Sequence, residues 1–438
     1  MAVGRIGPEA VLLGDGSVLV VGGEARGSEE EPEAGPSAER WDPAIGTWQT
    51  TQSLNNPRTL FAAVPLADGR ALVTGGLNDS EQSYSSTYVY DPRPGYETWS
   101  KVGLLDTART APAAALLPDG RVLIAGGYYH TGVIEGAAAA PDAILASYHR
   151  AAPGTGGSLR SPLDDIDMPP VGYALATAEL YDPGTGSWSA TGPMTFARVG
   201  ASAVNLADGR VLVVGSSPFD VTKVDGRAYD TAEIYDPKTG RFSLAGSLPD
   251  IDRSAVEQLG VPLPEGDPAP AANGTLVALP DGGAVLIGHG AWWKHQGDIV
   301  RSFRFDAGTG GWVEIGQPCA WADDWETDTL ARTPGVCHLG ALVAALDDGR
   351  VLVAGGRGAY QTSAPNSATA ELYDPATDSW SALPPMPEPR AVGAAVVLAD
   401  GSVLLVGGYD ERPSPDSGYE RVVLAPAIRF VPSTPSDR

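Results

Sequence analysis

One pattern recurs through the chain and constrains its fold more than any other feature. An Asp-Gly dipeptide is followed by a short apolar run and, in most copies, by two glycines, as from Asp348 to Gly356. Seven copies begin at Asp15, Asp68, Asp119, Asp208, Asp281, Asp348 and Asp400. A second apolar run precedes each copy, and two apolar runs joined by an Asp-Gly turn are a strong signal for a β-hairpin.

A second pattern follows most copies and also indicates a hairpin. It is clearest from Ala370 to Trp380, where Tyr373-Asp374-Pro375 leads into a turn. Close variants run from Trp41 to Trp48, Tyr90 to Trp99, Tyr181 to Trp188, Tyr235 to Phe242 and Phe305 to Trp312. Two hairpins per repeat predict a four-stranded antiparallel sheet. Seven repeats predict an all-β, seven-bladed β-propeller that occupies residues 1–438 as a single domain.

The double glycine, the Tyr-Asp-Pro turn and the Trp about six residues later resemble the kelch repeat. The resemblance covers nearly the whole chain and implies a kelch-type propeller. In such a blade both short turns lie on one face, and the longer connections lie on the other. The long insertions all belong to that second face: 128–176 within blade 3, 243–272 between blades 4 and 5, and 317–337 between blades 5 and 6. Insertions are where such folds carry function.

The closure of the ring is also predicted from the repeat. An Arg stands ten residues before the Asp of the turn in five copies: Arg5, Arg58, Arg109, Arg198 and Arg390. Because Arg5 keeps this register, we expect the first blade to be complete at its inner edge. We expect residues 421–424 and 428–431 to form the two outer strands of the last blade, with no strand exchanged between the termini.

Charge and composition exclude several classes of partner. The formal net charge of −25 disfavours nucleic acids and anionic membranes, because both reward a basic surface. No apolar run is long enough to span a bilayer, and no signal peptide precedes the first repeat. We therefore expect a cytoplasmic monomer, with a trimmed secreted form as the alternative.

The rare residues concentrate on the insertion face of blades 3, 5 and 6. We expect His289 and His338 to transfer protons, with Asp323, Asp324 or Glu326 assisting. Core packing is the alternative for His338. The candidate ligand-binding residues are Tyr129, His130, Trp292, Trp293, His295, Trp321 and Trp325. Tryptophans in loops favour stacking on a ligand. The acidic stretch could instead bind calcium, or simply form a solvated loop.

The repeated arginines have two interpretations. Arg58, Arg109, Arg198 and Arg390 resemble arginines with which some kelch domains bind acidic ligands, which implies a carboxylate-bearing substrate. Their recurrence equally fits a structural role, in which they hydrogen-bond to backbone carbonyls. Cys319 and Cys337 bracket one insertion and could form a disulfide or remain free thiols, and their spacing disfavours zinc.

Copper radical oxidases built on kelch propellers place a Tyr-His pair on an inner strand shortly before an Asp-Gly turn. Here Tyr129-His130 and Tyr148-His149 lie in the blade 3 insertion, so this register is absent. We therefore predict no metal cofactor.

Two function classes remain. One is a cofactor-independent acid/base enzyme of isomerase, cyclase, lyase or hydrolase type, acting on a small molecule at the channel mouth. The other is a module that binds a protein or peptide on the same face. The concentration of His and Trp in one sector favours the enzyme.

Overall fold

The computed structural model of the chain describes residues 1–23, 38–54, 56–78, 82–130, 172–216, 227–250, 269–272, 274–293, 297–316, 319–324, 329–332, 338–356, 366–414 and 418–432. Only the backbone is described at 227, 269–272, 289–293, 297–299, 319–324, 329–332, 413–414 and 418–421.

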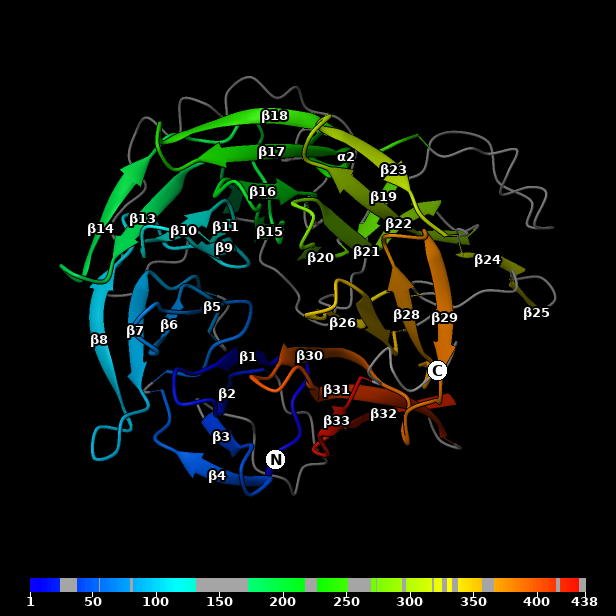
Figure 1. Ribbon diagram of the computed structural model, residues 1–438, viewed down its shortest axis with the longest axis horizontal. Helices are drawn as coiled ribbons and strands as arrows, with labels where there is room; N and C mark the ends of the chain where they lie inside the picture. The colour runs from blue at the N-terminus through cyan, green and yellow to red at the C-terminus, as the bar shows by residue number, and fades with distance from the viewer. Residues whose placement is uncertain are drawn as a thin grey trace.

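Seven β-sheets follow one another around a central axis, so the predicted seven-bladed propeller is confirmed (Figure 1). Blade 1 consists of β1 (Glu9–Leu12), β2 (Val18–Val21), β3 (Ala38–Asp42) and β4 (Thr47–Thr51). Blade 2 consists of β5 (Ala62–Pro65), β6 (Ala71–Thr74), β7 (Ser86–Asp91) and β8 (Thr98–Leu104). Blade 6 consists of β26 (Leu342–Ala345), β27 (Val351–Ala354), β28 (Ala370–Asp374) and β29 (Ser379–Leu383). All neighbours in these sheets are antiparallel.

Blades 3 and 4 keep the same order and add short elements. Blade 3 consists of β9 (Ala113–Leu116), β10 (Val122–Ala125), β13 (Ala178–Asp182) and β14 (Ser187–Thr191). A separate ribbon of β11 (Tyr128–His130) and β12 (Gly172–Ala174) stands at the base of its insertion. Blade 4 consists of β15 (Ser202–Asn205), β16 (Val211–Val214), β17 (Thr231–Asp236) and β18 (Arg241–Ser247), with the short helix α2 (Arg227–Asp230) before β17. No helix in the described ranges is long and apolar enough to cross a membrane.

Blade 5 is enlarged by the insertions on either side of it. Its four repeat strands are β20 (Thr275–Ala278), β21 (Ala284–Trp293), β22 (Gly297–Asp306) and β23 (Gly311–Glu314). β21 and β22 run well past the usual strand length. β19 (Ala269–Ala272) pairs with the far half of β21, β24 (Cys319–Asp324) pairs with the far half of β22, and β25 (Thr329–Arg332) pairs with β24. Described residues 269–272, 319–324 and 329–332 of the two insertions therefore extend this sheet, whereas the sequence predicted loops; residues 243–247 belong to β18 of blade 4.

The last blade differs from its prediction. It contains β30 (Ala391–Val397), β31 (Val403–Ser414), β32 (Gly418–Val423) and β33 (Ile428–Phe430). β33 pairs with the near end of β31 and takes the third position in the blade, whereas β32 pairs with the far end from Tyr409 to Ser414. Because β31 is so long, β32 extends a hairpin away from the blade, and it is not an outer strand. The described residues before β1 form no strand, in line with the expected absence of exchange.

Apolar side chains pack between neighbouring blades. The second strand of a blade is covered on both faces, so β2, β6, β10 and β16 are buried along their whole length. Between blades 4 and 5, for example, Leu212 packs with Leu286 and Phe303. Each sheet is therefore stabilised mainly by the faces of its two neighbours, as in other repeat architectures.

The innermost strands close the ring through backbone hydrogen bonds near the insertion face. The amide of Val392 donates to the carbonyl of Gly340 over 2.8 Å, and the amide of Gly7 donates to Val392 over 2.8 Å. The latter bond joins blade 1 to blade 7. In blades 3 and 4 the equivalent residues repeat this link, from Ala111 to Leu60 and from Gly200 to Ala111. Consecutive inner strands contact one another around the whole channel.

Candidate functional site

The five register arginines are buried and bonded to backbone within their own blades. Each donates from Nη1 to the carbonyl oxygen of the glycine seventeen residues later. The pairs are Arg5–Gly22 (2.8 Å), Arg58–Gly75 (3.0 Å), Arg109–Gly126 (2.9 Å), Arg198–Gly215 (3.2 Å) and Arg390–Gly407 (3.2 Å). Their side chains are 0–3% exposed. These contacts support the structural interpretation, because no guanidinium faces solvent where an acidic ligand could reach it.

In blades 3 and 4 a glutamate on the third strand forms an ion pair with the register arginine. Glu233 forms an ion pair with Arg198 over 3.1 Å, and Glu179 forms one with Arg109. In blade 2 the equivalent residue is Tyr88, whose ring lies 5.1 Å from the guanidinium carbon of Arg58. Burial lowers the pKa of Arg198, and the Glu233 carboxylate opposes that shift. The pair therefore keeps a buried charge compensated.

Blade 6 keeps the glutamate but replaces the arginine with His338. Nε2 of His338 lies 3.1 Å from Oε2 of Glu371. The imidazole stacks on the indole of Trp380, with ring centroids 5.4 Å apart and an angle of 10° between the planes. The His338 side chain is 11% exposed, and its Nδ1 is buried with no hydrogen-bond partner among the described residues. Of the predicted proton-transfer residues, His338 is the one whose side chain and partners are described.

Blade 5 has neither the register arginine nor the third-strand glutamate. Ala271 stands in the arginine register and Phe303 in the glutamate register. Arg301, two residues before Phe303 on the same strand, covers the Phe303 ring at 4.6 Å and pairs with Glu314 over 2.6 Å. The backbones of blades 5 and 6 nevertheless lie close together, because a Cβ added at Gly288 would lie 2.4 Å from the carbonyl oxygen of His338. His338 therefore lies at the junction with the enlarged blade.

The sheet register brings two of the predicted ligand-binding tryptophans into one cross-strand row. Trp292 of β21 lies opposite Asp298 of β22, and Asp298 lies opposite Trp321 of β24. The next pair joins Trp321 to Arg332 of β25. These positions are far apart in sequence, and only the pairing of β22 with β24 places them side by side.

Several predicted residues cannot be placed in this way. His295, Trp325, Glu326 and Cys337 lie outside the described residues, as does Tyr148-His149. For His289, Trp292, Trp293, Cys319, Trp321, Asp323 and Asp324 the backbone alone is described. No group of three or more potential metal ligands occurs among the residues that the structure covers.

Tyr129 and His130 lie in the ribbon of blade 3, three blades from His338. The Tyr129 ring packs against Tyr173 with centroids 5.1 Å apart, and the His130 ring lies 4.8 Å from that of Tyr128. His130 is 1% exposed, and its backbone amide donates to Oγ of Ser83 over 3.2 Å. The structure therefore does not bring these residues together with His338 at one site.

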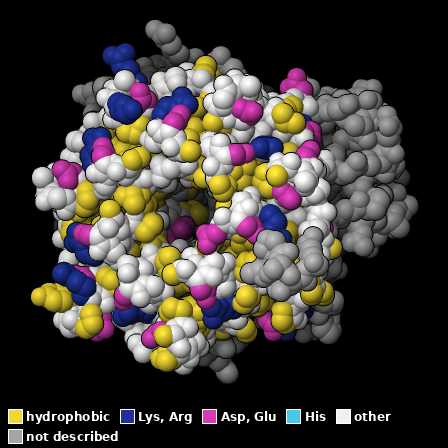
Figure 2. Space-filling model, viewed as in Figure 1, with side chains coloured by type: hydrophobic (Ala, Val, Ile, Leu, Met, Phe, Trp, Pro, Cys, Tyr) yellow, Lys and Arg dark blue, Asp and Glu magenta, His cyan; other side chains and the backbone are white. Residues whose placement is uncertain are grey.

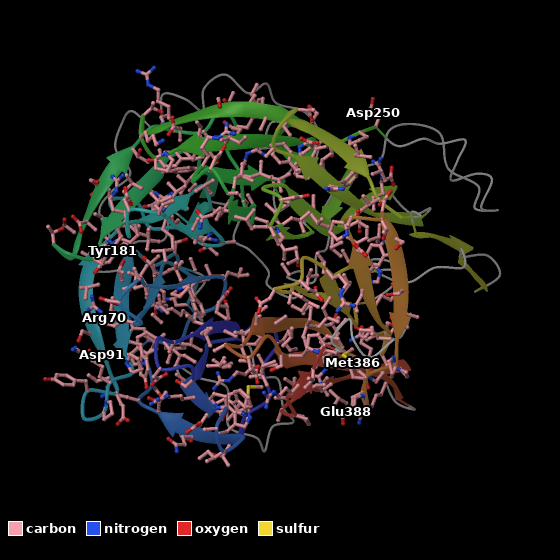
Figure 3. All side chains as sticks on the ribbon, in the orientation of Figure 1. Arg70, Asp91, Tyr181, Asp250, Met386 and Glu388 are labelled. Atoms are coloured by element: carbon pink, nitrogen blue, oxygen red, sulfur yellow. The ribbon has the colours of Figure 1, made fainter. Side chains whose placement is uncertain are left out.

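The opposite face carries paired charges and one cavity. Arg70 lies 2.7 Å from Asp68 of its own turn, and in Figure 3 it lies near Asp91 and Tyr181. On this same face, a cavity of about 470 Å³ opens between blades 3 and 4. It is lined by Pro118, Asp119, Asp208, Gly209, Arg210, Asp236, Pro237 and Lys238. No predicted site residue lines it.

Two functional candidates escaped the sequence analysis. Glu371 belongs to the Ala-Glu-Leu-Tyr-Asp pattern and was treated as part of a hairpin, although the recurrence of Glu39, Glu179 and Glu233 in blades that also carry the arginine was a usable signal. Glu9 is an ionisable residue on an inner strand, and comparing the seven inner strands position by position would have found it.

Comparison with known proteins agrees with this architecture. A family model described as the Kelch motif matches residues 341–387, which span β26 to β29 of blade 6. The same hairpin order recurs in the other complete blades. The protein is a seven-bladed β-propeller with a kelch motif in blade 6.

Two curated proteins to which this chain is similar are kelch-like proteins. Kelch-like protein terF of Aspergillus terreus is 37% identical over 84 residues, which are 19% of this chain and 18% of that protein. Kelch-like protein 25 of Xenopus tropicalis is 23% identical over 334 residues, or 76% of this chain and 42% of that protein. The matched regions span less than half the length of either relative.

A solved structure shares the fold. A fungal alcohol oxidase of the AA5 family, in complex with copper, matches with a TM-score of 0.54 and 17% identity. The match covers 97% of this chain and 74% of that one. At this identity the similarity concerns the fold alone, because unrelated functions share one architecture.

Proposed function

We propose that this kelch propeller is a cofactor-independent enzyme that moves protons on a small molecule, with His338 and Glu371 as its acid/base pair. The observation that carries the proposal is the geometry of this pair: one ring nitrogen is held by a carboxylate at 3.1 Å, and the other is buried and has no partner in the part of the chain that the structure describes. An imidazole oriented in this way is a common arrangement for general acid/base catalysis.

The chemistry follows from the hydrogen bond. When Nε2–H donates to the Glu371 carboxylate, Nδ1 carries the lone pair, and substrate binding must expose this buried nitrogen before it accepts a proton. The carboxylate stabilises the imidazolium that forms, and the stack on Trp380 fixes the plane of the ring. The abstracted proton exchanges with solvent, and delivery of a solvent-derived proton to a different substrate atom completes an isomerisation or cyclisation. Proton transfer of this kind is worth about 10²–10⁴ in rate.

The test uses the repeat itself as a control. His338→Arg restores the residue that five other blades carry, so it should preserve the fold and remove the base. His338→Gln and Glu371→Gln are nearly isosteric neutral variants. Each protein is incubated in D₂O with a mixed extract of small metabolites, and mass spectrometry measures solvent deuterium gained by individual compounds.

We expect the wild-type protein to deuterate a small set of compounds. The rate should fall at least about a hundredfold in both His338 variants and less in Glu371→Gln. Equal labelling by wild type and His338→Arg would show that the pair is structural. Labelling no greater than with heat-inactivated protein would reject the enzyme and favour the protein- or peptide-binding alternative.

A further inference from the structure

Glu9 belongs to the innermost strand of blade 1, which borders the central channel. It is the first residue of β1, the innermost strand of blade 1, and it lies opposite Val21 of β2. Alternation along the strand puts Glu9 on the same face as Val11, which packs with Phe61 of blade 2. Glu9 is partly buried. Its surroundings on this side of the strand are therefore apolar.

The repeat does not require an acid at this position. Counting four residues on from the register position gives the equivalent residues of the other blades, which are Ala62, Ala113, Ser202, Thr275, Leu342 and Ala394. None of them is ionisable. The other six blades pack without an ionisable residue at this position, so blade packing does not explain why Glu9 is acidic.

Within the described residues, no cation pairs with the carboxylate of Glu9. No hydrogen bond or ion pair joins its side chain to any described residue. The nearest register arginines are engaged elsewhere, since Arg5 bonds to Gly22 and Arg58 bonds to Gly75 and Ser86. Glu39, the third-strand carboxylate of the same blade, accepts from the amide of Ala2. Burial alone raises the pKa of Glu9 to about 7, with no contribution from a neighbouring charge.

The shape and field of the molecule favour a cationic occupant. Figure 2 shows a hollow at the centre of the ring, with hydrophobic side chains on its rim and an acidic side chain within it. The net charge of −25 draws cations toward the protein. A lone carboxylate suits a monovalent ammonium group better than a divalent metal, which takes several oxygen ligands.

We propose that Glu9 and the apolar walls around it form a binding site in the channel for an organic ammonium ion, with the ammonium paired to the carboxylate and the hydrocarbon part against the inner strands. This inference is independent of the catalytic role proposed for His338, which lies in blade 6.

The experiment measures binding of butylammonium to the whole chain by ligand-observed NMR, with butan-1-ol as the neutral analogue. Glu9→Gln removes the charge with little change of shape. Glu9→Ala introduces the residue that blades 2, 3 and 7 carry at this position, so it should fold. Glu97→Gln removes an exposed carboxylate as a matched control, and melting temperatures confirm that each variant is folded.

We expect millimolar binding of butylammonium at pH 8.5 that weakens at least tenfold in both Glu9 variants, in wild type at pH 5.5, and for butan-1-ol. Glu97→Gln should bind as wild type does. Affinities that are equal in wild type and Glu9→Gln, or equal for the amine and the alcohol, would overturn the proposal. No detectable binding of butylammonium up to about 10 mM would overturn the proposal as well, because this concentration is on the order of the weak affinity expected for so small a ligand.

Discussion

At the residue scale, the informative change is from arginine to histidine at position 338. In blades 3 and 4 a permanently charged guanidinium is buried with its glutamate. In blade 6 the glutamate remains, while an imidazole stands where the guanidinium is in the other blades. Because His338→Arg restores the residue that five other blades carry, this variant separates a structural role from the proposed proton transfer.

Glu9 supplies a pH-dependent prediction at the same scale. Its folded pKa of about 7 lies above the ordinary value of 4.5, so the folded state holds the proton more tightly than the unfolded state. The free energy of unfolding should therefore fall as pH rises from 4.5 to about 7, and then level off. Glu9→Gln removes this penalty.

We expect Glu9→Gln to be more stable than wild type at pH 8.5, by about 1–2 kcal/mol beyond the difference at pH 5.5. Urea unfolding at the two pH values measures this, and both lie above the isoelectric point of about 4.4. Glu97→Gln is the control. A Glu9→Gln advantage that does not change with pH would show that Glu9 titrates normally.

At the element scale, the backbone of the next blade leaves no room for a side chain on the glycine that ends the second strand. Gly126 has a φ of +68°, and a Cβ there would lie 2.5 Å from the carbonyl oxygen of Arg198. Gly355 has the same relation to Arg390, at 2.2 Å. The double glycine is thus where one blade contacts the backbone of its neighbour, which explains why it recurs with the arginine.

Two alanine substitutions separate backbone strain from this contact. Gly16 has a φ of +83°, but no atom lies within 4 Å of an added Cβ. Gly16→Ala should therefore cost only about 1–2 kcal/mol of conformational strain. Gly126→Ala adds a collision with backbone and should cost about 3 kcal/mol or more. Denaturant midpoints measure both, and equal losses would contradict the contact.

At the scale of the whole molecule, the ring is closed by residues before the first strand. The amide of Gly408 donates to the carbonyl of Arg5 over 2.7 Å, and the amide of Gly7 donates to Val392. The amino group of Met1 reaches the carbonyl of Ala425 over 3.1 Å. Blades 7 and 1 are therefore joined by the same backbone links that join the other blades.

Deleting residues 1–7 should open this junction locally. We expect hydrogen–deuterium exchange to rise in β1, β30 and β31, because these strands lose their hydrogen-bonded neighbours, whereas β15 to β17 on the far side of the ring stay protected. Mass spectrometry of peptides from both regions provides the internal control. Uniform acceleration across all blades would show that closure stabilises the ring globally, and unchanged exchange would show that these bonds contribute little.

The repeat by itself determined the fold. Asp-Gly turns between apolar runs specify hairpins locally, and seven copies leave few ways to bury all the apolar faces except in a ring. The register arginines were identified for the same reason, although their ligands were not. From sequence alone, an arginine at a strand start can face solvent or backbone equally well. Only the structure shows that Arg5 and Arg109 donate to the carbonyls of Gly22 and Gly126.

The tertiary structure decided what the repeat could not specify. Insertions have no repeat to compare with, so the extension of blade 5 by β24 and β25 and the row from Trp292 to Trp321 depended on long-range pairing. The length of β31 likewise moved β32 out of the last blade. The His338–Glu371 pair joins residues from different hairpins of one blade. Local sequence determines hairpins, whereas a site is formed where separate hairpins meet, and that meeting depends on the packing of the whole ring.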